Sequence, residues 1–143
     1  MDFYTKYRYL IIPIVLWILI QSFKFLYELI VNHKLNFKRL MGAGGMPSSH
    51  SAVVVSTCTM IAKEYGIDSA IFALSFVFAC VVMYDAAGVR RAAGKQAKML
   101  NKIAETPGLT NVQMQEKLVE VLGHTPMQVI VGAIIGLIIG IIA

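Results

Sequence analysis

Apolar residues along this chain gather into four blocks that are separated by polar stretches. The blocks span Tyr9–Val31, Ser48–Lys63, Ser69–Met83 and Met127–Ala143. A helix needs about 20 apolar residues to cross a bilayer, so blocks of this kind predict membrane helices. We therefore expect an all-α, polytopic membrane helical bundle with four transmembrane helices, or with three and a re-entrant segment.

The stretch between the third and fourth blocks is polar. Basic residues recur at helical spacing within Val89–Ile103, which predicts an amphipathic or solvated helix with a basic stripe. The sequence Thr106-Pro107-Gly108 ends this helix, and a second polar helix is expected over Thr110–Leu122. We expect the lysines of the stripe to face solvent or lipid headgroups. The stripe consists of Arg91, Lys95, Lys98 and Lys102.

The composition supports this interpretation. Of the 143 residues, 57% are hydrophobic and 15% are charged, which is too apolar for an ordinary soluble domain and suits one membrane domain over residues 1–143. No small-residue cleavage site follows the first block, so no cleavable signal peptide is expected. Cys58 and Cys80 lie inside apolar blocks, where they are expected to pack. Neither Cys/His metal spacing nor a GxxxxGK[ST] loop occurs, which argues against a metal site and nucleotide hydrolysis.

The basic residues are divided unequally between the two sides of the predicted bundle. The side with the loops after the first and third helices carries nine of them, and the other side carries three. By the positive-inside rule the richer side lies in the cytoplasm. Lys24 lies within a predicted transmembrane helix and is therefore counted on neither side. The nine are Lys34, Lys38, Arg39, Arg90, Arg91, Lys95, Lys98, Lys102 and Lys117, and the three are Lys6, Arg8 and Lys63.

Two of the apolar blocks begin with the same kind of entry, built from glycine, proline, hydroxyl and histidine residues. In the first, Gly44–Ser51, Pro47 suits a first helical turn, and Ser48 or Ser49 can cap it. The second is Gly123-His124-Thr125-Pro126. Free amides at a helix start, together with the positive end of the helix dipole, form a site for an anion. The alternative for the first entry is a well-capped helix with an incidental histidine.

The predicted topology brings chemically active side chains to one membrane face. His50 begins the second span and His124 the fourth, and Asp85, Arg90 and Arg91 lie at the end of the third. Two histidines, guanidinium groups and two helix starts suit a phosphate ester. One histidine can attack phosphorus while the other protonates the leaving oxygen. Arginines and helix amides can hold the charge on the remaining oxygens.

These residues also resemble known motifs. Pro47-Ser48-Ser49-His50 resembles the PSGH motif of the type 2 phosphatidic acid phosphatase superfamily, which includes vanadium haloperoxidases. The run from His124 to Gln128 resembles the H-x-x-x-D element of its last motif. Taken together, GGMPSSHSA, VMYDAAGVRRAAGKQA and LGHTP resemble the divergent bacterial and plant branch of that superfamily. The resemblance covers nearly the entire chain.

The resemblance implies roles for the two histidines. His124 would be the nucleophile that forms a phosphohistidine, and His50 would be the general acid. Ser48 and the backbone amides of Ser49 and His50 would hold the phosphate.

The cations depart from the superfamily pattern. Its first motif, K-x6-R-P, is absent, and Lys24, Lys38 or Arg39 are candidates for that role. Its last motif has an arginine six residues before the histidine, whereas Arg90 and Arg91 precede His124 by more than thirty. The residues expected to bind the substrate phosphate are Ser48, Ser49, Arg90, Arg91, Lys24 and Arg39.

The acid that orients the nucleophile in the superfamily is also replaced. Gln128 stands at its position, and a glutamine can accept from an imidazole N–H but adds no negative charge. Asp85 is the expected substitute because it is an acid at the same membrane face. The alternative for Asp85 is an ion pair with Arg90 or Arg91.

We therefore expect a metal-independent membrane phosphatase, without a cofactor, that acts on a lipid phosphate at the cytoplasmic face. Phosphatidylglycerophosphate-like, phosphatidate-like and prenyl-phosphate headgroups would fit. The expected partners are this substrate and membrane lipids, not nucleic acid. The alternatives are a non-catalytic membrane protein that binds anionic lipid or serves as a scaffold and, with less support, a small anion or lipid transporter. Gly132, Gly136 and Gly140 line one helix face, which would pack within the chain or form a homodimer.

Overall fold

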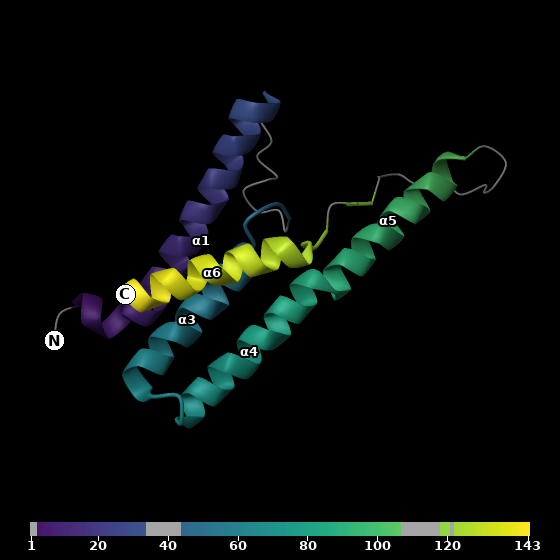
Figure 1. The fold of residues 1–143 in the computed structure, drawn as a ribbon. Coiled ribbons are helices and arrows are strands. Elements are labelled where there is room, and N and C mark those ends of the chain that lie inside the picture. Colours follow the sequence, from purple (N-terminus) through teal and green to yellow (C-terminus); the bar gives the residue numbers. More distant parts are fainter. Residues whose placement is uncertain (1–2, 34–43, 107–117, 121) are drawn as a thin grey trace.

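The structure is a computed structural model that describes residues 3–33, 44–106, 118–120 and 122–143. Within these ranges its regular structure is entirely helical. Four of the helices correspond to the predicted apolar blocks and the remaining one to the predicted basic helix, which confirms the all-α prediction. The helices (Figure 1) are α1 (Phe3–Asn32), α3 (Ser49–Tyr65), α4 (Ala70–Ala87), α5 (Val89–Glu105) and α6 (Pro126–Ile142).

The four apolar helices alternate in direction, so that α3 and α6 begin where α4 ends (Figure 1). Two backbone hydrogen bonds hold these ends together. The N–H of Ser48 donates to the carbonyl of Gln128 over 3.0 Å, and the N–H of His124 donates to the carbonyl of Ala86 over 2.9 Å. The starts of α3 and α6 are therefore fixed to each other and to α4, at what we call the polar end of the bundle.

The opposite end of the bundle is held by charged side chains. The guanidinium of Arg8 on α1 pairs with the carboxylate of Glu64 on α3 over 2.6 Å. Nζ of Lys63 donates to the carbonyl of Ile141 over 2.6 Å and so satisfies an acceptor in the last turn of α6. These contacts connect α3 to both α1 and α6.

Helix α3 lies at the centre and packs against α1, α4 and α6. Its side chains are small, and Ala52 is fully buried against Leu16 and Ile20 of α1, with Ile135 and Ile139 of α6 packed beside them. Small residues allow helix backbones to approach closely. This explains why the second apolar block is less hydrophobic than the others: other helices, not lipid, cover it.

The glycines of α6 face α3 within the same chain. A Cβ atom at Gly132 would overlap the carbonyl oxygen of Ser48, and one at Gly136 would overlap that of Ala52. Gly140 makes a similar approach further along α3. Of the two alternatives for these glycines, packing within the chain is therefore the one that the structure shows. The homodimer through the last helix stays a prediction.

The outer faces of the bundle are apolar, as expected for a membrane protein. The segments Lys6–Val31 and Ala70–Glu105 are long and apolar enough to cross a bilayer, and Pro126–Ile142 is a shorter apolar helix. Large hydrophobic side chains point outward from them, including Leu19, Leu74 and Ile138. A soluble protein rarely exposes so much apolar surface, whereas lipid would cover it. The structure therefore fits a membrane helical bundle, and the prediction of four spans stays a prediction.

The predicted helix over Thr110–Leu122 is wrong where the structure can test it. Leu118–Glu120 and Leu122 are not helical, and the rest of that range lies outside the described residues. The side chain of Asn101 on α5 donates to the carbonyl of Leu118 over 2.9 Å and accepts from its N–H over 3.0 Å. Hydrogen bonds to α5 thus replace those that a helix would have supplied.

Candidate functional site

The first half of the site is the start of α3. Ser48 is the N-cap, and its hydroxyl accepts from the N–H of Ser51 over 3.3 Å and from the hydroxyl of Ser51 over 3.0 Å. This confirms the predicted cap and selects Ser48 rather than Ser49. Ser48, Ser49 and Ser51 are buried. Because the N–H and hydroxyl of Ser48 are engaged within the chain, Ser48 stabilises the helix start that carries His50.

The second half is the start of α6. Gly123 has a φ of 83°, and a side chain there would overlap the backbone of Arg90 and Arg91. This close approach brings the next residue, His124, to the junction of α4 and α5, where its side chain is 1% exposed. Thr125 is the N-cap of α6, and Pro126 lies in the first turn, as the sequence predicts.

A capping box orients the imidazole of His124. The hydroxyl of Thr125 accepts from the N–H of Gln128 over 3.4 Å, and Oε1 of Gln128 accepts from the N–H of Thr125 over 3.0 Å. The second bond fixes which end of the Gln128 amide is the oxygen. Nδ1 of His124 lies 3.4 Å from that same oxygen. A hydrogen bond between these two atoms requires Nδ1 to donate, and in the neutral ring Nε2 then has the free electron pair.

The two histidines face each other across the polar end. Their ring centroids are 6.1 Å apart with an edge-to-face angle of 62°. Nδ1 of His50 and Nε2 of His124 are buried and have no hydrogen-bond partner in the described part of the chain. At this separation one phosphoryl group can contact both rings. The geometry thus brings together the two residues that the sequence singled out.

Lys24 brings a positive charge to the site. Its side chain is 5% exposed, as is that of Gln21 one turn earlier. His124 lies outside the spanning helices. Burial lowers the pKa of His124 from 6.5, and the positive charge of Lys24 lowers it further, against an opposing contribution from the hydrogen bond to Gln128. These effects together favour the neutral form of the His124 imidazole.

Asp85 forms an ion pair with Arg90, which is the alternative role considered for it from the sequence. Oδ2 of Asp85 accepts from Nε of Arg90 over 2.6 Å, and both side chains are partly exposed. The acceptor that contacts Nδ1 of His124 is Gln128. The prediction that Asp85 orients His124 is therefore corrected, because its carboxylate pairs with Arg90. The capping pattern T-x-x-Q at Thr125–Gln128 was the signal that could have identified Gln128.

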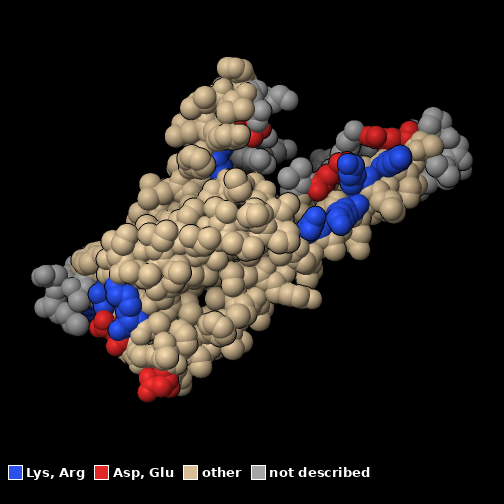
Figure 2. Space-filling model, viewed as in Figure 1, with Lys and Arg blue, Asp and Glu red and all other residues tan. Residues whose placement is uncertain are grey.

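A cavity of about 300 Å³ lies beside His124. It is bordered by α5 on one side and by the start of α6 on the other, and basic side chains of α5 line it. Figure 2 shows these basic groups along the arm that α5 forms. The lysines of this stripe are exposed, which agrees with the sequence prediction, but the position of Lys95 and Lys98 beside His124 was missed. The charged and titratable lining residues are Arg91, Lys95, Lys98, Glu120 and His124.

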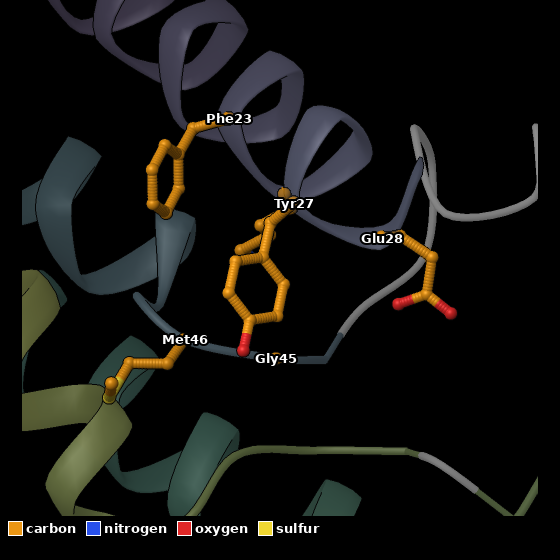
Figure 3. Close-up of a pocket in the computed structure, with 6 residues that line it drawn as sticks. Phe23, Tyr27, Glu28, Gly45 and Met46 are labelled. Atoms are coloured by element: carbon orange, nitrogen blue, oxygen red, sulfur yellow. The ribbon is translucent and has the colours of Figure 1, made fainter. Parts of the chain in front are cut away.

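A second cavity of about 240 Å³ lies between α1 and the entry to α3 (Figure 3). Phe23, Tyr27 and Glu28 of α1 border it together with Lys24. Gly45, on its other side, also borders the cavity next to His124, so the two cavities adjoin at this residue. Lys38 and Arg39, two of the predicted phosphate-binding candidates, lie outside the described residues.

Comparison with known proteins gives two matches over most of the chain. Residues 5–139 match a family described as the Divergent PAP2 family. The chain is also 40% identical over 126 residues to the uncharacterized membrane protein YuiD of Bacillus subtilis (strain 168), and the match covers 80% of each chain. No solved structure matches the chain significantly.

Proposed function

Because the chain belongs to the Divergent PAP2 family, we propose that it is a membrane phosphatase that hydrolyses a lipid phosphate monoester at the cytoplasmic face. Membership supports a relationship to a phosphatase superfamily, and similarity to a membrane protein supports the location. The observation that carries the proposal is the histidine pair. His124 presents a free, buried Nε2 to a site that also contains His50 at the start of α3.

In the first step the free electron pair of His124 Nε2 attacks phosphorus. A nitrogen–phosphorus bond forms, the bond from phosphorus to the lipid oxygen breaks, and that oxygen takes a proton from His50. The lipid alcohol leaves, and the phosphoryl group stays on His124. Nδ1 of His124 keeps its proton and donates more strongly to Gln128 as the ring becomes positive.

In the second step water hydrolyses the phosphohistidine. His50, which is now neutral, takes a proton from the attacking water. The oxygen–phosphorus bond forms, the nitrogen–phosphorus bond breaks, and the electron pair returns to Nε2 of His124. Inorganic phosphate leaves, and both histidines regain their starting protonation states.

Fixed positive groups stabilise the charge on phosphorus oxygens in both steps. Lys24 is buried beside the histidines, and Arg91 borders the cavity next to His124. The first-turn amides of α3 add the positive end of a helix dipole. The backbone N–H of Ser48 and its hydroxyl are already engaged, so the amides of Ser49 and His50 are the ones proposed to bind phosphate.

The cytoplasmic face is proposed from the charge distribution. The sequence assigns nine of the thirteen Lys and Arg residues to the side that carries the histidines. The exposed apolar faces next to this end would keep the substrate's hydrocarbon tail in lipid while its headgroup reaches the site.

A phosphate-release screen tests the proposal. The full-length protein, purified in mild detergent or reconstituted in nanodiscs, is incubated with phosphatidate, phosphatidylglycerophosphate and prenyl phosphates without added metal. We expect phosphate release from at least one of these lipids and inhibition by vanadate. Saturable binding of the same lipids without any phosphate release would instead identify a non-catalytic lipid-binding protein.

Replacing Gln128 with glutamate should shift the pH dependence of this activity. In the native protein the lowered pKa of His124 places the acidic limb of the pH–rate profile below pH 6.5. Glutamate retains the capping box and adds a negative charge at the oxygen that accepts from Nδ1. The pKa of His124 rises, so the acidic limb of kcat/KM should move to higher pH.

Thr125→Ala is the matched control for this shift. It breaks the other half of the capping box and leaves the oxygen of Gln128 beside His124. We expect it to lower thermal stability by about 1 kcal/mol without moving the acidic limb. An unshifted profile in Gln128→Glu, or an equal shift in Thr125→Ala, would show that Gln128 acts only as a helix cap.

A further inference from the structure

The cavity beside His124 has more positive charge than one phosphate monoester requires. Three cations on one face of α5, Arg91, Lys95 and Lys98, line it, and Glu120 offsets one of them. Lys24 is also close enough to lower the pKa of His124. A phosphate monoester carries a charge of about −1.5 to −2 at pH 7. Lys24, the helix start and Arg91 can balance that charge, which leaves Lys95 and Lys98 with one net positive charge once Glu120 is counted.

The chain that returns to His124 is fixed against α5, so Lys95 and Lys98, although exposed, have a defined position beside the cavity. A Cβ atom at Gly94 would overlap the carbonyl oxygens of Glu120 and Leu122, which means that the returning chain lies directly on α5. Asn101 fixes the same segment through Leu118 and through a 2.9 Å hydrogen bond to the carboxylate of Glu120. The chain then passes over the backbone of α5 at Gly123 and continues into His124.

The stripe also extends beyond the cavity. Lys102 continues the series one turn after Lys98 but does not border the cavity. A general attraction to anionic membrane surfaces would involve Lys102 about as much as Lys98, because the two lysines are one helical turn apart, which is less than a Debye length. A specific site would involve only the lysines that line the cavity.

We infer that Lys95 and Lys98 form a second anion subsite, which binds a second phosphate group of the lipid headgroup while the first phosphate lies at His124. This inference rests on the proposed function and narrows the substrate to lipids whose headgroup carries two phosphates. The two phosphates can be joined directly, as in a lipid diphosphate, or separated by a polyol. Both present the same chemistry to the subsite.

Two matched pairs of lipids test the subsite. They also distinguish a lipid diphosphate from a headgroup whose two phosphates are separated by a polyol. Prenyl diphosphate is compared with prenyl monophosphate, and phosphatidylglycerophosphate with phosphatidate, as substrates of the full-length protein. We expect kcat/KM to favour the two-phosphate lipid by about tenfold or more in at least one pair. Lys98→Gln, and separately Lys95→Gln, should reduce that preference about tenfold. Lys102→Gln, the matched control on the same helix face, should leave the preference within about twofold.

Binding to the inactive protein separates failure of the subsite from failure of the proposed function. In a His124→Asn background, the affinity for each lipid in nanodiscs is measured with and without Lys98→Gln. A weaker affinity for the two-phosphate lipid alone supports the subsite even if no lipid is hydrolysed. Equal kcat/KM and equal affinity within both pairs, or equal effects of Lys98→Gln and Lys102→Gln, would overturn it.

Discussion

Replacing His124 with asparagine is expected to reduce phosphate release by on the order of a thousandfold or more. Asparagine fits the space of the imidazole and can still hydrogen bond to Gln128, but it has no nucleophilic nitrogen. The lost step is the formation of the nitrogen–phosphorus bond, for which water at the same position is a poor substitute. The measurement is the initial rate of phosphate release from the best lipid substrate.

His33→Asn is the control for this variant because it makes the same substitution at an exposed histidine. His33 has a φ of 50°, a backbone conformation that asparagine tolerates. We expect it to retain the activity of the native protein. A His124→Asn protein that folds and still releases phosphate at the native rate would rule out the phosphohistidine mechanism.

The second large effect is expected from Gly136→Val on the face of α6 that contacts α3. The new Cβ would overlap the carbonyl oxygen of Ala52, and backbone cannot rotate away as a side chain can. Overpacking of a buried contact costs about 1–3 kcal/mol, and we expect the upper end of that range here. Separation of α6 from α3 would also move His124 relative to His50, so activity should fall with stability.

Ile138→Val introduces the same residue two positions away on the same helix, where the side chain is exposed. Thermal unfolding in detergent, followed by circular dichroism, compares the two variants. We expect a clearly lower midpoint for Gly136→Val and a midpoint near the native value for Ile138→Val. Equal midpoints would contradict the close packing of α3 on α6.

The helices and their caps could be predicted because their signals are local. Long apolar blocks set the positions of α1, α3, α4 and α6, and hydroxyl residues before them gave the caps at Ser48 and Thr125. Alternating helix direction then implied that His50 and His124 share one end of the bundle. The structure has them in contact there.

The remaining features depend on contacts between distant segments, which a local pattern does not specify. The spacing of Gly132, Gly136 and Gly140 predicts a close helix contact but does not say that the neighbour is α3. Leu118–Glu120 belong to a segment of helical composition but are not helical, and Leu118 hydrogen bonds to Asn101 of α5 instead.

The orientation of the His124 ring also depends on contacts that a local sequence pattern does not specify. An acid at the right membrane face made Asp85 the natural candidate, but the choice between Asp85 and Gln128 depends on side-chain directions within a few ångströms. Arg90 binds the carboxylate of Asp85, while the capping box turns the oxygen of Gln128 toward His124. Similarly, only the folded return of the chain over Gly94 brings Lys95 and Lys98 beside the histidine.

The central claim is that His124 carries the phosphoryl group during turnover. The most direct measurement is to mix the protein with a lipid phosphate substrate, stop the reaction at alkaline pH, where phosphohistidine survives, and locate the phosphate by peptide mass spectrometry. We predict a phosphate adduct on His124 that disappears when the sample is acidified and that is absent from His124→Asn. Phosphate release accompanied by an adduct on a different residue, or by none while His124→Asn remains active, would contradict the claim.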